Sequence, residues 1–130
     1  MDRDRLLPLA LRVIGAIFIV GVLPMMIVWP SGWRWAPHNH EYEQMIMVVY
    51  AVLGVFLILA AQDPPEHRSL LQFTVFSSVA HAAVMTVHAF GMPGEHWHLA
   101  ADIPALLIVA GVLAVLMPPG PARRERAVPA

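Results

Sequence analysis

Four apolar blocks constrain the possible fold of this chain more than any other feature of its sequence. They run from Leu6 to Val28, Met45 to Ala61, Leu70 to Phe90 and Leu99 to Met117. About 20 helical residues cross the hydrocarbon core of a bilayer, so each block with its flanks is long enough to span it. The composition agrees, since 58% of the residues are hydrophobic and only 13% are charged. The sequence therefore predicts an all-α fold, an integral membrane four-helix bundle.

The predicted spans cover about residues 6–28, 42–62, 66–90 and 97–117, joined by short connections. We therefore expect a single domain over residues 1–130 without a separate soluble part. The first block is interpreted as a retained span, because it is longer than the apolar core of a signal peptide and lacks a small-residue cleavage site.

Arginine positions predict the orientation, because Lys and Arg are retained on the cytoplasmic side of a membrane. All but one of the arginines fall on the side of the two termini: Arg3, Arg5, Arg12, Arg68, Arg123, Arg124 and Arg126, with Arg34 as the exception. Aromatic residues, which favour the membrane interface, collect on the opposite side: Trp29, Trp33, Trp35, Tyr42 and Trp97. Both the N and C termini are therefore predicted to be cytoplasmic.

Two connections carry local signals. In QDPPEHRS, Asp63 is placed to cap the third helix, with Pro64 at its first position and Glu66 completing a capping box.

The fourth helix has two possible starts. A start at Asp102 leaves about 15 residues, which is short for a span, whereas a start near Glu95 gives the right length with a kink at Pro104. We favour the kinked version.

Two histidines lie within the third apolar block. His81 and His88 differ by only about 20° around a helix, so they share one face. Other polar or polarisable residues fall within the same arc: Thr74, Ser77, Ser78 and Met85. A polar stripe in lipid turns toward other helices or toward a water-filled cavity, and we expect this stripe to face the bundle interior.

Further polar residues converge at the outer ends of the spans. From them we predict a polar ligand or cofactor site of His81, His88 and Tyr50, and a metal site of Glu43, His88, His98 and Asp102. The cofactor is unknown: a transition metal ion suits these side chains, whereas haem suits them less, since His88 with His98 is the one pair that could lie on facing helices. Each residue also has a structural interpretation, such as a buried, hydrogen-bonded histidine or a helix cap.

The segment from Trp29 to Met85 contains several distinctive motifs. They are the WPSGW turn, Tyr42-Glu43-Gln44-Met45, Tyr50, Leu53-Gly54, the Asp-Pro turn with His67-Arg68-Ser69, and Ser77-Ser78 followed by His81. In these motifs the chain resembles a small family of bacterial four-span membrane proteins that carry a domain of unknown function. The resemblance implies four helices in a bacterial inner (plasma) membrane and brings no activity, substrate or cofactor with it.

Three functions remain open. The first is a binding or accessory protein for a small ligand, with a polar His and Glu site in the outer half of the bundle. The second is a proton-coupled transporter that acts as a homodimer and uses His81, and the third is a structural subunit without chemistry. An enzyme is the least supported class, because no acid, base and nucleophile can be assigned. A net charge of -1 without a basic patch argues against nucleic acid as a partner, and the partner expected from composition is the lipid bilayer.

Overall fold

The computed structural model describes residues 2–37 and 40–120, and these residues form helices without strands. Four helical segments are long and apolar enough to cross a membrane: Arg3–Val28, Glu41–Ala60, Arg68–Gly91 and Glu95–Leu116. The predicted all-α class with four membrane-spanning helices is thereby confirmed. Many large apolar side chains point outward, such as Val28, Phe76 and Val87, which are 81%, 71% and 73% exposed. Such a surface implies contact with the lipid bilayer.

The first span changes its hydrogen-bond pattern in the middle. It consists of α1 (Arg3–Ala16), the π-helical turn η1 (Ile17–Gly21) and α2 (Val22–Val28). Pro24 explains where the π-helical turn lies. A proline inside a helix removes one hydrogen bond, and its ring crowds the carbonyl four residues earlier. The wider π turn directly before it accommodates that disturbance without ending the helix.

The WPSGW segment is partly helical. After Trp29 the chain forms one short helical turn, α3 (Pro30–Trp33), with proline at its first position. The combination of Trp, Pro and Gly in residues 29–40 predicts an irregular interfacial loop, and this prediction is wrong for the four residues of α3. The turn seats Gly32 against Ala101, since a Cβ at Gly32 would lie 2.8 Å from the Cβ of Ala101. The close approach fixes the segment against the fourth span.

The second and third spans are α4 (His40–Ala60) and α5 (Arg68–Gly91). The predicted capping box between them is wrong, because α5 begins at Arg68 and not next to Asp63. The N–H groups of Glu66 and His67 bond to the carbonyls of Asp63 and Pro64 three residues earlier, at 3.2 Å each. These residues thus form tight turns, and the α-helical pattern starts only after them.

The fourth span divides at Ala101. The 3₁₀ helix η2 (Glu95–Ala100) precedes α6 (Asp102–Leu116), and Ala101 between them has φ -119° and ψ -99°. The favoured start near Glu95 and the alternative start at Asp102 each describe part of this arrangement. The interruption lies at Ala101, however, and not at Pro104, which fits into the first turn of α6, where its missing N–H costs nothing.

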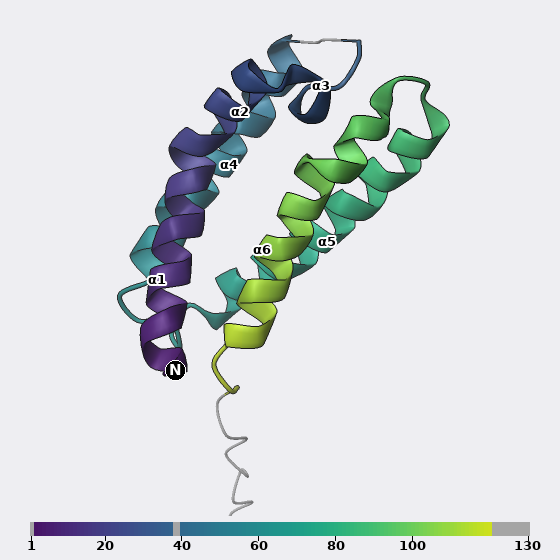
Figure 1. Ribbon diagram of the computed structural model, residues 1–130. Coiled ribbons are helices and arrows are strands. Elements are labelled where there is room, and N and C mark those ends of the chain that lie inside the picture. The colour runs from purple at the N-terminus through teal and green to yellow at the C-terminus, as the bar shows by residue number, and fades with distance from the viewer. Residues whose placement is uncertain (1, 38–39, 121–130) are drawn as a thin grey trace, which may run out of the picture.

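The helices form two antiparallel pairs, α1 with α4 and α5 with α6 (Figure 1). The pairs contact each other through α1 and α6, and again through α3 and η2. We call the end with Arg3 and Leu116 the terminal end, and the opposite end, with α3 and η2, the α3 end. Figure 1 shows that the pairs come together at the terminal end and lie farther apart toward the α3 end.

The main apolar core lies toward the terminal end. Its buried residues come from all four spans: Leu7, Leu11, Ile14, Phe18, Leu57, Ala60, Ala61, Leu71 and Leu113. Beside it, α1 and α4 cross at Gly15 and Gly54, where a Cβ on Gly54 would lie 2.5 Å from the carbonyl oxygen of Gly15. Small residues permit this backbone approach, which is a common way of packing helices in lipid.

Candidate functional site

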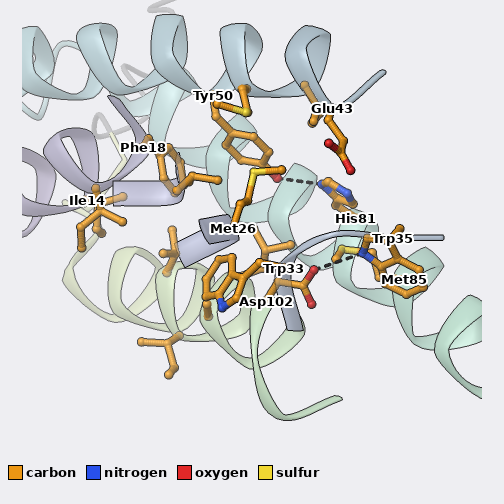
Figure 2. Close-up of a pocket in the computed structure, with 18 of the residues that line it drawn as sticks. Ile14, Phe18, Met26, Trp33, Trp35, Glu43, Tyr50, His81, Met85 and Asp102 are labelled. Atoms are coloured by element: carbon orange, nitrogen blue, oxygen red, sulfur yellow. Dashed lines mark hydrogen bonds between the residues drawn. The ribbon is translucent and has the colours of Figure 1, made fainter. Parts of the chain in front are cut away.

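A pocket of about 720 Å³ lies between the two helix pairs (Figure 2). Its wall is mostly apolar along α1, η1 and α6, with residues such as Ala10, Ile14, Phe18, Val109 and Val112. Its polar residues come from α4, α5 and the start of α6: Glu43, Tyr50, His81 and Asp102. The pocket therefore has one apolar region and one polar region. Its volume is in the range of small-molecule sites, about 300–1,000 Å³.

Tyr50 and His81 form a hydrogen-bonded pair across the pocket. The hydroxyl of Tyr50 lies 2.7 Å from Nδ1 of His81, and the two rings are nearly parallel, with 20° between their planes. The edge of Phe18 packs on Tyr50, with ring centroids 5.0 Å apart. Because Tyr50 is held from both sides, its hydroxyl keeps a fixed position at the pocket wall.

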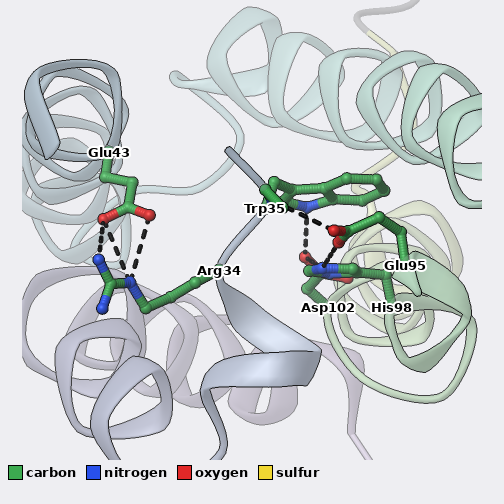
Figure 3. Close-up of polar contacts among 7 residues, drawn as sticks. Arg34, Trp35, Glu43, Glu95, His98 and Asp102 are labelled. Atoms are coloured by element: carbon green, nitrogen blue, oxygen red, sulfur yellow. Dashed lines mark hydrogen bonds and ion pairs between the residues drawn. The ribbon is translucent and has the colours of Figure 1, made fainter. Parts of the chain in front are cut away.

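A second group of polar side chains joins η2 and α6 to the segment after α3, and we call it the Asp102 cluster: Trp35, Glu95, His98 and Asp102 (Figure 3). Asp102 Oδ2 accepts a hydrogen bond from Trp35 Nε1 at 3.1 Å and shares another with His98 Nδ1 at 2.8 Å. His98 Nε2 lies 3.0 Å from Glu95 Oε2. The imidazole is fully buried between two carboxylates.

Trp35 covers this cluster. Its ring stacks on His98, with ring centroids 3.8 Å apart and 17° between the planes. The following backbone is held as well, because the N–H of Ala36 donates to Glu95 Oε1 at 3.2 Å. These contacts pin the segment after α3 to the fourth span and close the α3 end of the bundle.

Two buried polar atoms of pocket-lining residues have no hydrogen-bond partner among the described residues. They are the indole Nε1 of Trp33 and Oδ1 of Asp102. A buried donor or acceptor without a partner costs free energy, about 1–3 kcal/mol in proteins. Both atoms are therefore suited to meet a polar group of a bound molecule.

Arg34 and Glu43 pair beside the pocket. The guanidinium donates from Nη2 to Glu43 Oε2 at 2.9 Å and from Nε to both carboxylate oxygens at 3.2 and 3.3 Å (Figure 3). The charge of Arg34, the one arginine predicted on the side opposite the termini, is therefore matched locally.

The structure brings together most of the residues that we predicted for a site. Tyr50, His81, Glu43 and Asp102 line one pocket, and His98 bonds to Asp102 directly behind its wall. His88 is different, because it is exposed and meets the others only through the edge of Trp35, with ring centroids 6.4 Å apart. Within residues 2–37 and 40–120, no three His, Asp or Glu side chains are arranged to hold a metal ion.

The polar stripe on α5 is buried at Thr74, Ser78 and Met85, as predicted. The hydroxyl of Thr74 donates to the carbonyl of Leu70 within the same helix, at 2.9 Å. These residues thus serve close packing, and among the stripe's polar members His81 alone lines the pocket.

Two tryptophans of the pocket are not among the predicted site residues. The sequence places Trp33 and Trp35 at the membrane interface. Trp29 and Trp97, for which it makes the same prediction, do lie exposed and meet edge to face. Spacing along the sequence does not separate the two kinds of tryptophan. Trp35 reaches Asp102 across 67 positions of the chain, and only the packing of α3 on η2 brings them together.

Comparison with known proteins gives one curated relative and one family. Over 92 residues the chain is 34% identical to ferric-chelate reductase 1 of Bos taurus. These residues make up 68% of this chain and 14% of the relative. The chain thus spans about a seventh of that protein's length. No solved structure matches the chain. A family model matches residues 2–127, nearly the whole sequence, and the chain belongs to this family, described as a family of unknown function (DUF6632).

Proposed function

We propose that this protein is a membrane-embedded binding protein whose pocket takes up a small, largely apolar molecule from the bilayer. The observation that carries this proposal is the pocket itself, about 720 Å³ between the two helix pairs. Small-molecule sites combine an apolar wall with a few placed polar groups. This pocket has that composition.

The polar region supports an oriented mode of binding. Tyr50 and His81 present a fixed hydroxyl and imidazole, and Asp102 and Trp33 present a buried acceptor and a buried donor. A ligand would place its polar group among these four residues and extend its apolar body along α1 and α6. This arrangement shares His81, Tyr50 and Asp102 with the sites predicted from the sequence and adds Trp33.

The proposal includes the location of the protein. We infer a bacterial inner membrane from the family resemblance of the sequence. We further infer that both termini are cytoplasmic, because Arg3, Arg5, Arg12 and Arg68 lie toward the terminal end, whereas Arg34 at the α3 end is paired with Glu43. The pocket's polar region would then lie in the outer half of the membrane. Reporter fusions at the two ends of the chain test this, and reporters active on opposite sides would contradict it.

One comparison favours a second candidate. The likeness to a ferric-chelate reductase suggests a part in the reduction of ferric chelates. The test is to measure the formation of ferrous iron by membranes that contain the protein, with Fe(III)-citrate as substrate and a coloured ferrous chelator as readout. A rate equal to that of control membranes would remove this candidate and leave the binding proposal unaffected.

The binding proposal is tested by what the purified protein retains. The protein is purified from membranes in mild detergent, extracted with organic solvent, and the extract is compared by mass spectrometry with that of the Ala105→Phe variant. Ala105 lines the pocket, so a phenylalanine there places a ring in the space that a ligand would occupy. We expect a lipid-soluble molecule at about one per chain in the unchanged protein and a clear loss in the variant.

The matched control is Ala83→Phe, which adds the same ring to the exposed side of α5. It should retain the molecule at the level of the unchanged protein. If the three extracts contain the same molecules in the same amounts, the pocket is not a binding site and the proposal is wrong.

A further inference from the structure

Within the Asp102 cluster, the carboxylates among the described residues outnumber the cationic side chains. Arg34 neutralises Glu43 in the ion pair beside the pocket. The Asp102 cluster then has two carboxylates, Glu95 and Asp102, for one imidazole, His98. When both carboxylates are ionised, one negative charge remains in a buried position even if His98 carries a proton. A buried charge without a counterion is costly, so a cation placed next to it would be stabilised.

Asp102, which holds the remaining acceptor of this cluster, is one of the residues that line the pocket. Asp102 is 8% exposed, its Oδ2 is used by Trp35 and His98, and its Oδ1 is buried without a partner. Figure 2 shows the carboxylate of Asp102 together with Trp33 among the residues that line the pocket. Because an ionised carboxylate only accepts hydrogen bonds, the group that pairs with Oδ1 must be a donor.

Aromatic rings line the same pocket. The pocket wall includes five aromatic side chains: Phe18, Trp33, Trp35, Tyr42 and Tyr50. The face of an aromatic ring attracts a cation within about 6 Å of its centroid, and this attraction grows when water is excluded. Among the aromatic side chains, tryptophan attracts a cation most strongly. Rings and carboxylate thus favour the same kind of ligand.

From these three observations we infer that the ligand class is a lipophilic amine, whose protonated nitrogen donates to Asp102 Oδ1 and whose apolar body lies along α1 and α6. This inference rests on the proposed binding function and adds the charge and the donor of the ligand. The nitrogen lies against Trp33 and Trp35, and the hydrocarbon part fills the apolar region next to Ile14 and Val109.

Three probes with the same tail separate charge from hydrogen bonding. Octylamine carries a charge and N–H donors at pH 7, octyltrimethylammonium carries the charge alone, and 1-octanol is neutral but can donate to Asp102 and accept from Trp33. The full chain in lipid nanodiscs is equilibrated with each probe by dialysis, and empty nanodiscs are subtracted. We expect octylamine to bind about tenfold more tightly than 1-octanol, with octyltrimethylammonium between them.

Asp102→Asn removes the charge and keeps the shape of the side chain. It should lower the affinity for octylamine about tenfold and leave that for 1-octanol nearly unchanged. The matched control is Asp63→Asn, which makes the same change in an exposed turn at the terminal end and should not alter any of the three affinities. If Asp102→Asn does not fold, the ranking of the probes on the unchanged protein still decides.

Each contrary outcome has a distinct meaning. Equal binding of octylamine and 1-octanol, both weakened by Ala105→Phe, overturns the amine inference and leaves the binding function standing. Octyltrimethylammonium that binds as tightly as octylamine overturns the hydrogen bond to Asp102 Oδ1. Octylamine that binds without any response to Ala105→Phe overturns both the inference and the function on which it rests.

Discussion

The two ends of the bundle are built in different ways. At the terminal end, apolar side chains from four spans fill the interior and α1 crosses α4 at two glycines. At the α3 end, the helix pairs are held apart and are joined by polar contacts among Trp35, His98 and Asp102. In lipid, where apolar surface gains little by leaving the membrane, close packing and hydrogen bonds have to hold helices together. In this protein, close packing holds the helices together at the terminal end, and hydrogen bonds join them at the α3 end.

The largest effect is expected at the glycine crossing. In Gly54→Ala the new Cβ would lie 2.5 Å from the carbonyl oxygen of Gly15, so the backbones of α1 and α4 must separate. We expect a loss of about 3 kcal/mol in the free energy of unfolding, at the upper end for overpacked sites. Unfolding in mixed micelles with increasing SDS measures it. Gly111→Ala is the control, since nothing lies within 4 Å of its Cβ position; equal stability of both variants would contradict the close crossing.

A somewhat smaller loss is expected from a cavity in the same half. Leu57 is 0% exposed, whereas Leu59 on the same helix is 49% exposed. Leu57→Ala should cost about 2 kcal/mol, the low end for buried leucines, because the transfer from water that adds to this cost in soluble proteins is absent in lipid. The same SDS titration applies to Leu59→Ala, which should change stability little. Two equal losses would mean that this half is not packed as described.

In the polar half, the ion pair of Arg34 and Glu43 should contribute less. Its side chains are 24% and 17% exposed, so each charge is partly solvated. We expect Glu43→Gln to cost about 1 kcal/mol, because the guanidinium loses a charged partner. The single variants Arg34→Glu and Glu43→Arg place like charges together, and the double variant restores the pair in reverse. The double variant should therefore lose less thermal stability in detergent than the two single variants lose together. A loss larger than that sum would argue against direct pairing.

The smallest effect is expected for the hydrogen bond within the pocket. Tyr50→Phe removes the hydroxyl that lies 2.7 Å from His81 Nδ1. Hydrogen bonds between membrane helices contribute about 0.6 kcal/mol on average, and we expect a coupling of this size. A double-mutant cycle with His81→Leu isolates that term from other effects of each change. A coupling energy of zero would show that the pair, although close, does not stabilise the fold.

These differences also explain which predictions from sequence succeeded. The α5 stripe was predicted correctly for Thr74, Ser78 and Met85, because helical periodicity alone places residues on one face. The capping box at Asp63 failed, since its residues close tight turns instead. The exposure of His88 shows the limit of the same rule. His81 and His88 lie seven residues apart on the same face of α5. Their environments still differ, because the neighbouring helix pair lies farther from α5 toward the α3 end.

The sequence by itself determined that this chain folds into four membrane-spanning helices, because the length of each apolar block must match the thickness of a bilayer and its backbone must bond internally. Only the tertiary structure decided that Trp35 lies on His98, that Asp102 lines a pocket and has one oxygen without a hydrogen-bond partner, and that Tyr50 meets His81. Those contacts join residues far apart in the chain. They depend on the angle and depth at which the two helix pairs pack, which no local pattern of residues encodes.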